Sequence, residues 1–445
     1  MAAEAPTANG KVWATMALIA LGAVPAGALR LSGAHIDPIV GAMIYGGGIV
    51  CGAFLLSWAA EVAEMDISGS LAIALLALIA VLPEYTIEAV LAWDAGASYN
   101  PATQVITDEM ARAAANVTGA NRLLIGLGWS LVILIYWLKR REKLDLRGEM
   151  NLEISMLIVA TAIMGLIVVF QQVSIILAVV LIGVYLAYLW ISSTGESEEP
   201  ELIGVALVIG SLPVARRRAT VVLMFLYAAA VILLAAEPFV DGLIETGIEF
   251  GIDEFVLIQW IAPLASESPE IIIAVLFTLR SNPQAGLTTL VSSEVNQLTL
   301  LVGSITIVFS ISAGEVLSFP LDHRQSIEFM LTAAVSAFAI ILIAPRVLGP
   351  RVGLVLLGLF IVHLFFSDSG QRLIFSYIYF GLAIFLIVVD RGRIRQLIPR
   401  RPYNAEPYEA SKNHDTPLLE GGTLVSTRLK LLRNASHNAD SHWFA

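Results

Sequence analysis

The sequence predicts an all-α membrane protein of about twelve transmembrane helices, and three observations support this fold class. Hydrophobic residues make up 57% of the 445 residues and charged residues only 14%, against about 25% in an average soluble domain. Apolar runs of about 18 residues or more, long enough to cross a bilayer, recur along most of the chain. Two distant passages also repeat the same polar residues inside apolar runs, which predicts an internal duplication.

The expected transmembrane segments follow one another along most of the chain. The apolar stretch at 201–213 is too short to span a bilayer, so we expect it to lie at the interface or to re-enter the membrane. The expected spans have the approximate limits 12–31, 38–60, 70–93, 115–138, 152–170, 173–193, 219–236, 254–279, 286–312, 325–345, 352–367 and 373–390.

The basic residues distinguish the two sides of the membrane. They gather in alternate connections and at the start of the C-terminal tail, whereas the other connections hold single arginines. The positive-inside rule makes the rich side cytoplasmic, with both termini on it. We expect a plasma-membrane protein whose polar residues 402–445 form a disordered cytoplasmic tail. The rich set is Lys139, Arg140, Arg141, Lys143, Arg147, Arg216, Arg217, Arg218, Arg280, Arg346, Arg351, Arg391, Arg393, Arg395, Arg400 and Arg401, and the single arginines are Arg30, Arg112, Arg324 and Arg372.

Composition also limits the partners of the protein. The net charge of -11 lies in the connections and the tail, and we expect no nucleic-acid partner. Because Cys51 is the single cysteine, a disulfide within the chain is excluded and a cysteine-based metal site is not expected. We expect the lipid bilayer and inorganic cations as partners and no cofactor.

The internal duplication covers about five spans in each copy. An odd number of spans places the second copy upside down in the membrane, an arrangement typical of secondary transporters with a substrate site near the midplane. The first copy reads Ala59-Ala60-Glu61, Leu82-Pro83-Glu84, Asn121 and Gly128, and the second reads Ala235-Ala236-Glu237, Ser268-Pro269-Glu270, Asn296 and Gly303. The expected division is a cytoplasmic leader (1–11), an extra N-terminal helix (12–37), the first repeat (38–193), a cytoplasmic linker (194–218), the inverted second repeat (219–367), an extra C-terminal helix with a basic edge (368–401) and the tail (402–445).

Glu84 and Glu270 lie inside predicted spans, where a charge costs about 2.5–3.5 kcal/mol. No lysine lies in any span, and Arg122, near one end of its segment, is a weak candidate to neutralise them. The carboxylates are therefore expected to be protonated or to face a bound cation. A kinked helix with a protonated or pore-facing glutamate is the structural alternative for each.

Oxygen ligands surround these two glutamates in the sequence. Each preceding proline lacks an N–H, which frees the carbonyl of Ile79 in one copy and of Ala265 in the other. Asn121 and Asn296 add amide oxygens. Carboxylates, amides, carbonyls and waters approach the six to eight oxygens that Ca²⁺ prefers, and no soft-ligand cluster suited to zinc or copper is found.

Further polar residues are expected to widen the site or to relay protons. Glu88 follows Glu84 by one helical turn and Glu267 precedes Glu270 by three residues, so each shares a helix face with its neighbour. Glu294 is expected to point away from Asn296, and Glu61 and Glu237 are expected at the interfaces. The remaining candidate ligands are Asn116, Ser266 and Ser293.

Leu82-Pro83-Glu84 followed by Ala115-Asn116-Val117-Thr118-Gly119-Ala120-Asn121, with the second copy at Ser268-Pro269-Glu270 and Asn296, resembles the alpha-repeats of the calcium/cation antiporter superfamily. The resemblance implies that Glu84 and Glu270 bind the divalent ion. It also implies alternating access that carries Ca²⁺ one way and Na⁺ or H⁺ the other. The chain departs from the sodium/calcium exchangers at Ala80-Val81-Leu82, which lacks hydroxyls. This departure puts sodium as the counter-ion in doubt and leaves protons open.

Three alternatives stay open at this point. A monovalent cation/proton antiporter could share the same fold, and a channel could use the same polar residues. A membrane-embedded enzyme could use paired carboxylates, although no His-Glu-x-x-His motif or nucleophile with an adjacent base is present. We therefore expect a secondary cation antiporter rather than an enzyme.

Overall fold

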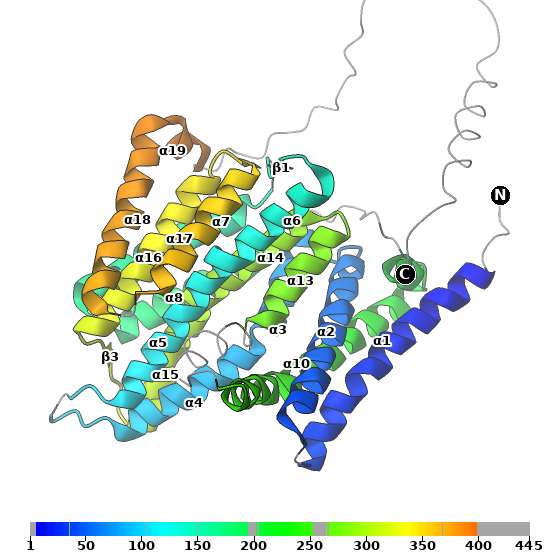
Figure 1. The fold of residues 1–445 in the computed structure, drawn as a ribbon, viewed down its shortest axis with the longest axis horizontal. Coiled ribbons are helices and arrows are strands. Elements are labelled where there is room, and N and C mark those ends of the chain that lie inside the picture. The colour runs from blue at the N-terminus through cyan, green and yellow to red at the C-terminus, as the bar shows by residue number, and fades with distance from the viewer. Residues whose placement is uncertain are drawn as a thin grey trace, which may run out of the picture. The chain divides into compact units, whose positions relative to one another are not determined.

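The computed structural model describes residues 6–34, 36–103, 105–147, 149–194, 202, 204–251, 264, 267–366 and 368–397, and these residues are mostly helical. They belong to the first of two compact units, Met1–Pro399. Figure 1 shows its helices packed side by side, with α4 continuing from α3. The predicted disordered tail at 402–445 lies outside the described residues.

The helices follow the chain in one long series. They are α1 (Pro6–Ser32), α2 (Pro38–Ala63), α3 (Gly69–Ala80), α4 (Leu82–Ser98), α5 (Asp108–Leu123), the π-helical turn η1 (Leu124–Trp129), α6 (Ser130–Arg140), α7 (Asn151–Phe170), α8 (Ile175–Ser193), α9 (Gly204–Gly210), α10 (Val214–Glu249), α13 (Ser268–Leu279), α14 (Pro283–Asn296), the π-helical turn η3 (Gln297–Leu301), α15 (Val302–Ala313), α16 (His323–Ile343), α17 (Pro350–Leu364), α18 (Ser369–Val389) and α19 (Gly392–Leu397).

Nine helices in the described part of the chain are long and apolar enough to cross a membrane. Two of them are continuous across a π-helical turn, α5–η1–α6 and α14–η3–α15. Three shorter apolar helices, α3, α13 and α17, lie where other spans are expected. The protein is therefore an integral membrane protein built from many transmembrane helices.

Two expected spans differ from the observed helices. The span at 70–93 is divided, because α3 ends at Ala80 and α4 begins at Leu82, which puts Pro83 in a first turn where no N–H is needed. The span expected to close at Glu237 continues to Glu249, and Pro238 lies inside this helix. The Glu237 side chain is 62% exposed and pairs with Arg30, so its charge does not force the helix to end. The short segment at 201–213 contains the seven-residue helix α9.

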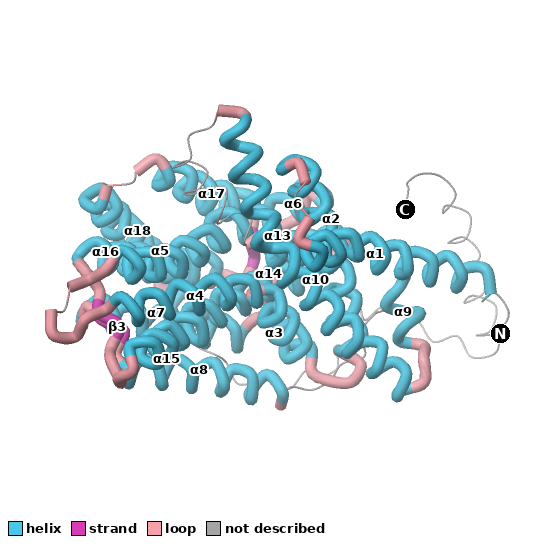
Figure 2. The backbone as a smooth tube through the Cα atoms, turned by 90° about the horizontal axis from the view of Figure 1, so that it is seen from below, coloured by secondary structure: helices cyan, strands magenta, loops and turns pink. Residues whose placement is uncertain are grey.

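Four two-residue strands lie in the connections, where Figure 2 shows them in magenta among the helices. β1 (Leu144–Asp145) precedes α7 and pairs antiparallel with β4 (Val347–Leu348), which follows α16. β2 (Gln172–Val173) follows α7 and pairs antiparallel with β3 (Phe319–Pro320), which precedes α16. α7 and α16 are therefore antiparallel neighbours joined at both ends.

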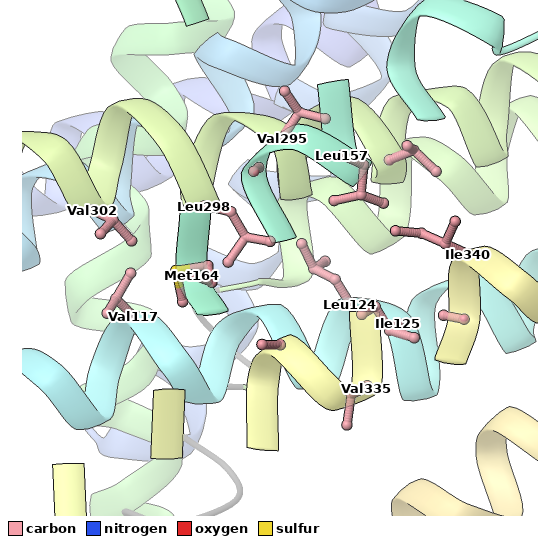
Figure 3. Packing of buried hydrophobic residues seen from close by; sticks show 14 of the residues in the cluster. Val117, Leu124, Ile125, Leu157, Met164, Val295, Leu298, Val302, Val335 and Ile340 are labelled. Carbon is pink, nitrogen blue, oxygen red and sulfur yellow. The ribbon is translucent and has the colours of Figure 1, made fainter. Parts of the chain in front are cut away.

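The main hydrophobic core joins the two long helices that contain π-helical turns. Figure 3 shows Val117 and Leu124 of the first long helix near Leu298 and Val302 of the second. Side chains of α7 and α16, such as Met164, fill the same cluster. A second cluster draws on α2, α3, α9, α10 and α13. This packing holds the helix segments that carry the intramembrane polar residues.

Candidate cation-binding site

The two Pro-Glu motifs each start a helix. Pro83 and Pro269 occupy the second positions of α4 and α13, and Glu84 and Glu270 occupy the third. Proline is tolerated there because the first turn of a helix has no intrahelical acceptor for its N–H groups. The helix dipole favours a carboxylate in the first turn. The same local rules therefore place a glutamate in the first turn of a helix in both halves of the chain.

The structure brings these two glutamates together and adds a third. One carboxylate oxygen each of Glu84, Glu267 and Glu270 can be chosen so that all three lie within 4.8 Å of one another. The three residues are at most 1% exposed. Neither carboxylate oxygen of Glu270 has a hydrogen-bond partner among the described residues. We call these three residues the carboxylate cluster.

Two of the three carboxylates in this cluster, Glu267 and Glu270, have no basic partner among the described residues. Glu267 and Glu270 take part in none of the ion pairs between described residues. Two unit charges within 4.8 Å of each other repel by at least roughly 3 kcal/mol at an effective dielectric constant of about 20. Buried carboxylates in this arrangement require protons or a cation. Their hard oxygen atoms suit Ca²⁺.

The two predicted asparagines are both fully buried and both precede a π-helical turn. Tyr85, which follows Glu84, donates a hydrogen bond of 2.6 Å to Oδ1 of Asn296, so Asn296 lies beside the Pro-Glu turn of the other half. Asn121 donates to the carbonyl of Val117 in its own helix at 2.8 Å, and its Oδ1 has no partner within the described part of the chain. π-helical turns are frequent at functional sites because they change the direction of nearby side chains and carbonyls.

The other candidate ligands lie at varied positions. Glu88 accepts a hydrogen bond of 2.9 Å from Asn116, outside the carboxylate cluster. Ser293 is fully buried, and its hydroxyl has no partner among described residues. The N–H of Val81 is shared by the carbonyls of Ala77 and Ile79, so the Ile79 carbonyl retains a donor. Ser266 and Ala265 lie outside the described residues.

Two residues next to the predicted ligands were not expected at the site. Tyr85 contacts Asn296, and Gln297 donates from Nε2 to both carboxylate oxygens of Glu267 at 3.0 and 3.2 Å. Gln297 is a polar residue in an apolar run directly after Asn296, and this position is the signal that could have indicated it.

Arg122, considered as a partner for the glutamates, contacts another residue. It pairs with Glu328 of α16 at 2.6 Å, and Arg372 of α18 pairs with the same carboxylate. Glu294 also bonds elsewhere, because its carboxylate accepts a hydrogen bond of 2.6 Å from Ser336. Arg122 and Glu294 therefore contact residues outside the carboxylate cluster.

Comparison with known proteins gives consistent results. The sequence profile of the family described as sodium/calcium exchanger protein matches residues 38–194 and 220–367. The crystal structure of the H⁺/Ca²⁺ exchanger CAX is 39% identical, with a TM-score of 0.75 over 87% of this chain and 97% of that one. The sodium-calcium exchanger NCX_Mj, soaked with 100 mM Na⁺ and 10 mM Sr²⁺, is 16% identical with a TM-score of 0.54 over 77% of this chain and 99% of that one, which supports the fold.

No curated protein sequence matches the chain. The family match covers both stretches that carry a Pro-Glu motif, and the CAX match extends over nearly the whole of that exchanger. The chain belongs to the sodium/calcium exchanger family, within the calcium/cation antiporter superfamily.

Proposed function

We propose that the protein exchanges Ca²⁺ for H⁺ by alternating access, with Glu84, Glu270, Asn121 and Asn296 at the transported ion. The observation that carries the proposal is the meeting of two fully buried glutamates, one from each half of the chain, in one cluster with the carboxylate of Glu267. The same oxygens can hold Ca²⁺ or protons, so binding of one ion displaces the other. This competition is the chemical requirement for exchange.

The choice of H⁺ over Na⁺ rests on two observations. Ala80, Val81 and Leu82, before the first Pro-Glu motif, have no hydroxyl to offer a sodium ion. The 39% identical relative is an H⁺/Ca²⁺ exchanger. Na⁺ exchange is the alternative counter-ion, and monovalent cation/proton exchange is the alternative function.

We further propose twelve spans in two inverted five-helix repeats, 38–193 and 219–367, with an extra helix at each end. The strand pairs support this arrangement. β1 lies between the third and fourth spans of the first repeat and pairs with β4, between the fourth and fifth spans of the second. β2 lies between the fourth and fifth spans of the first repeat and pairs with β3, which lies between the third and fourth spans of the second. A two-fold axis that interchanges inverted halves produces both pairs.

The proposed cytoplasmic face is supported by contacts between connections that are distant in sequence. Lys139 donates to the carbonyl of Leu279, and Arg140 donates to Ser281 at 2.9 Å. Arg217 pairs with Asp66 at 2.8 Å. Each contact joins two connections that the twelve-span arrangement places on the same side of the membrane, the side that the positive-inside rule makes cytoplasmic. We propose the plasma membrane as the location, with both termini in the cytoplasm.

Flux into proteoliposomes tests the proposal. An outward H⁺ gradient should drive ⁴⁵Ca²⁺ uptake into vesicles with the wild type, and uptake should fall at least about 100-fold with Glu84→Gln or Glu270→Gln. Glu294→Gln is the matched control, because it changes a buried carboxylate that bonds Ser336 instead of joining the cluster. Its uptake should stay within about threefold of the wild type.

Three outcomes would contradict the proposal. Uptake at the wild-type rate by Glu84→Gln or Glu270→Gln would show that these carboxylates do not bind the transported ion. Na⁺ or K⁺ exchange for H⁺ without Ca²⁺ transport would select the monovalent antiporter, and Ca²⁺ uptake that needs no counter-gradient would select a channel. Replacing the H⁺ gradient by a Na⁺ gradient identifies the counter-ion.

A further inference from the structure

The carboxylate cluster is asymmetric between the two halves of the chain. Glu267 stands three residues before Glu270, and the residue three before Glu84 is Val81. Glu267 is fully buried, and its carboxylate belongs to the cluster. Val81 is equally buried but has no ligand atom in its side chain. The second half therefore contributes two carboxylates where the first half contributes one.

A second difference accompanies the first. The residue after Asn296 is Gln297, whose Nε2 donates to both oxygens of Glu267. The residue after Asn121 is Arg122, whose guanidinium is paired with Glu328 at 2.6 Å. The residue after the asparagine therefore orients a carboxylate of the cluster in the second half. In the first half the residue at that position forms an ion pair with α16 instead.

The groups around Glu267 have more acceptors than donors. Gln297 is fully buried, and its Oε1 has no hydrogen-bond partner in the described part of the chain. Both carboxylate oxygens of Glu270 are likewise buried without a hydrogen-bond partner among the described residues. Buried polar atoms are nearly always satisfied, so several acceptors without donors at one place indicate protons or a cation as the missing partner.

We infer that Glu267, held by Gln297, is the residue that makes this site select ions of higher charge over ions of lower charge. The inference rests on the proposed function, since it concerns the same site. The Coulomb attraction of a carboxylate for an ion is proportional to the charge of the ion. A third carboxylate therefore strengthens the binding of a trivalent ion more than that of a divalent ion, and that of a divalent ion more than that of a monovalent one.

This proportionality gives a quantitative expectation for Glu267→Gln. The substitution removes one negative charge and keeps the shape of the side chain and an acceptor for Gln297. The dehydration cost of each ion is the same in both proteins, so it cancels in the comparison. If the affinity for Ca²⁺ falls about tenfold, the affinity for La³⁺ should fall about 30-fold, because the logarithm of the loss follows the ionic charge.

The experiment measures La³⁺ and Ca²⁺ binding to the purified full-length protein in detergent, by isothermal titration calorimetry at one fixed pH. Glu267→Gln should lower both affinities and reduce the preference for La³⁺ over Ca²⁺ by about threefold. Gln297→Met, which keeps the charge but removes the donor, should weaken both ions by similar factors and leave the preference unchanged. Glu294→Gln is the control with a buried carboxylate outside the cluster.

Equal losses for the two ions in Glu267→Gln, or no loss, would overturn the inference. A merely structural role for Glu267 predicts equal losses, since a distorted site weakens every ion. The thermal stability of each variant is recorded, and a variant that fails to fold is replaced by Glu267→Ser. If Glu84→Gln binds Ca²⁺ like the wild type, the proposed function fails instead, and the two failures are thus distinguished.

Discussion

The two halves of the molecule carry the same Pro-Glu helix start but surround it differently. In each half a proline in the first turn and a glutamate after it start a helix, and a buried asparagine precedes a π-helical turn. The residue directly after each asparagine differs between the halves. Arg122 pairs with Glu328, whereas Gln297 donates a hydrogen bond to Glu267. The shared residues provide a ligand and a helix start, and the residues that differ decide which charges lie close to the ligand.

The glutamates of the two Ala-Ala-Glu sequences, Glu61 and Glu237, also have different surroundings in the two halves. Glu61 of α2 pairs with Arg280 at 2.9 Å, and both side chains are less than one-fifth exposed. The guanidinium of Arg280 also lies over the rings of Phe54 and Trp58. Glu237 of α10 pairs with Arg30 instead, with side-chain exposures of 62% and 43%. One acid is therefore part of a packed contact between halves, and the other is in a surface ion pair.

The largest expected effect concerns the buried ion pair between Arg122 of the first half and Glu328 of the second. Glu328→Gln should lower the free energy of unfolding by about 3–5 kcal/mol, because Arg122 and Arg372 lose their shared carboxylate in a buried environment. Thermal and denaturant unfolding in detergent measures the change. The double variant Glu328→Gln/Arg122→Gln should recover part of the loss. A cost below about 1 kcal/mol for the single variant would show that the fold does not depend on this pair.

A smaller effect depends on pH and belongs to the connection after α2. Burial, and then the charges of Glu61 and Glu149, raise the pKa of Glu64 from 4.5 to about 7. The folded protein thus binds this proton more tightly than the unfolded chain. The stability that Glu64 contributes is full below about pH 4.5 and is lost as the pH rises through about 7. The corresponding position after Glu237 is Val240, whose side chain does not titrate.

Glu64→Gln should remove this dependence and stabilise the protein by about 1–3 kcal/mol at pH 8 relative to the wild type. The measurement is the unfolding midpoint of both proteins at pH 5, 6, 7 and 8. The two curves should approach each other toward low pH. Parallel curves over the whole range would mean that Glu64 does not titrate in this interval.

Arg280→Gln and Arg30→Gln test the difference between the two Ala-Ala-Glu acids directly. The first should cost about 1–2 kcal/mol of stability, since it removes a largely buried ion pair and two cation–π contacts. The second should cost less than about 0.5 kcal/mol, and that small cost should vanish at high salt. Unfolding at low and at high ionic strength gives both values. Equal costs would contradict the comparison.

Much of the site was predictable because polar residues are costly inside a membrane and therefore informative. Glu84 and Glu270 were expected to meet, and the structure places them within one cluster. Their role as ion ligands stays a prediction, as do the roles of Asn121 and Asn296. The family resemblance is confirmed by the family match.

The rest depended on contacts that no local pattern reveals. The partner of Arg122 lies 206 residues away on α16, and only packing brings Glu328 to it. The division of the expected span 70–93 at Val81 depends on whether proline falls in a helix interior or in a first turn, and both are compatible with the same residues. Gln297 was overlooked because its importance arises from the orientation of its amide toward Glu267.

The smallest expected effect separates the two asparagines. The hydroxyl of Tyr85 bonds Asn296, while the residue that follows Glu270 is Ile271, which cannot offer a hydrogen bond to Asn121. Tyr85→Phe should therefore weaken Ca²⁺ binding by about two- to tenfold, the range of one lost hydrogen bond. Tyr185→Phe is the matched control, since the Tyr185 hydroxyl is buried without a partner among described residues. Calorimetric titration of Ca²⁺ should give a lower affinity for Tyr85→Phe alone, and the same affinity in both variants would mean that Tyr85 does not position Asn296.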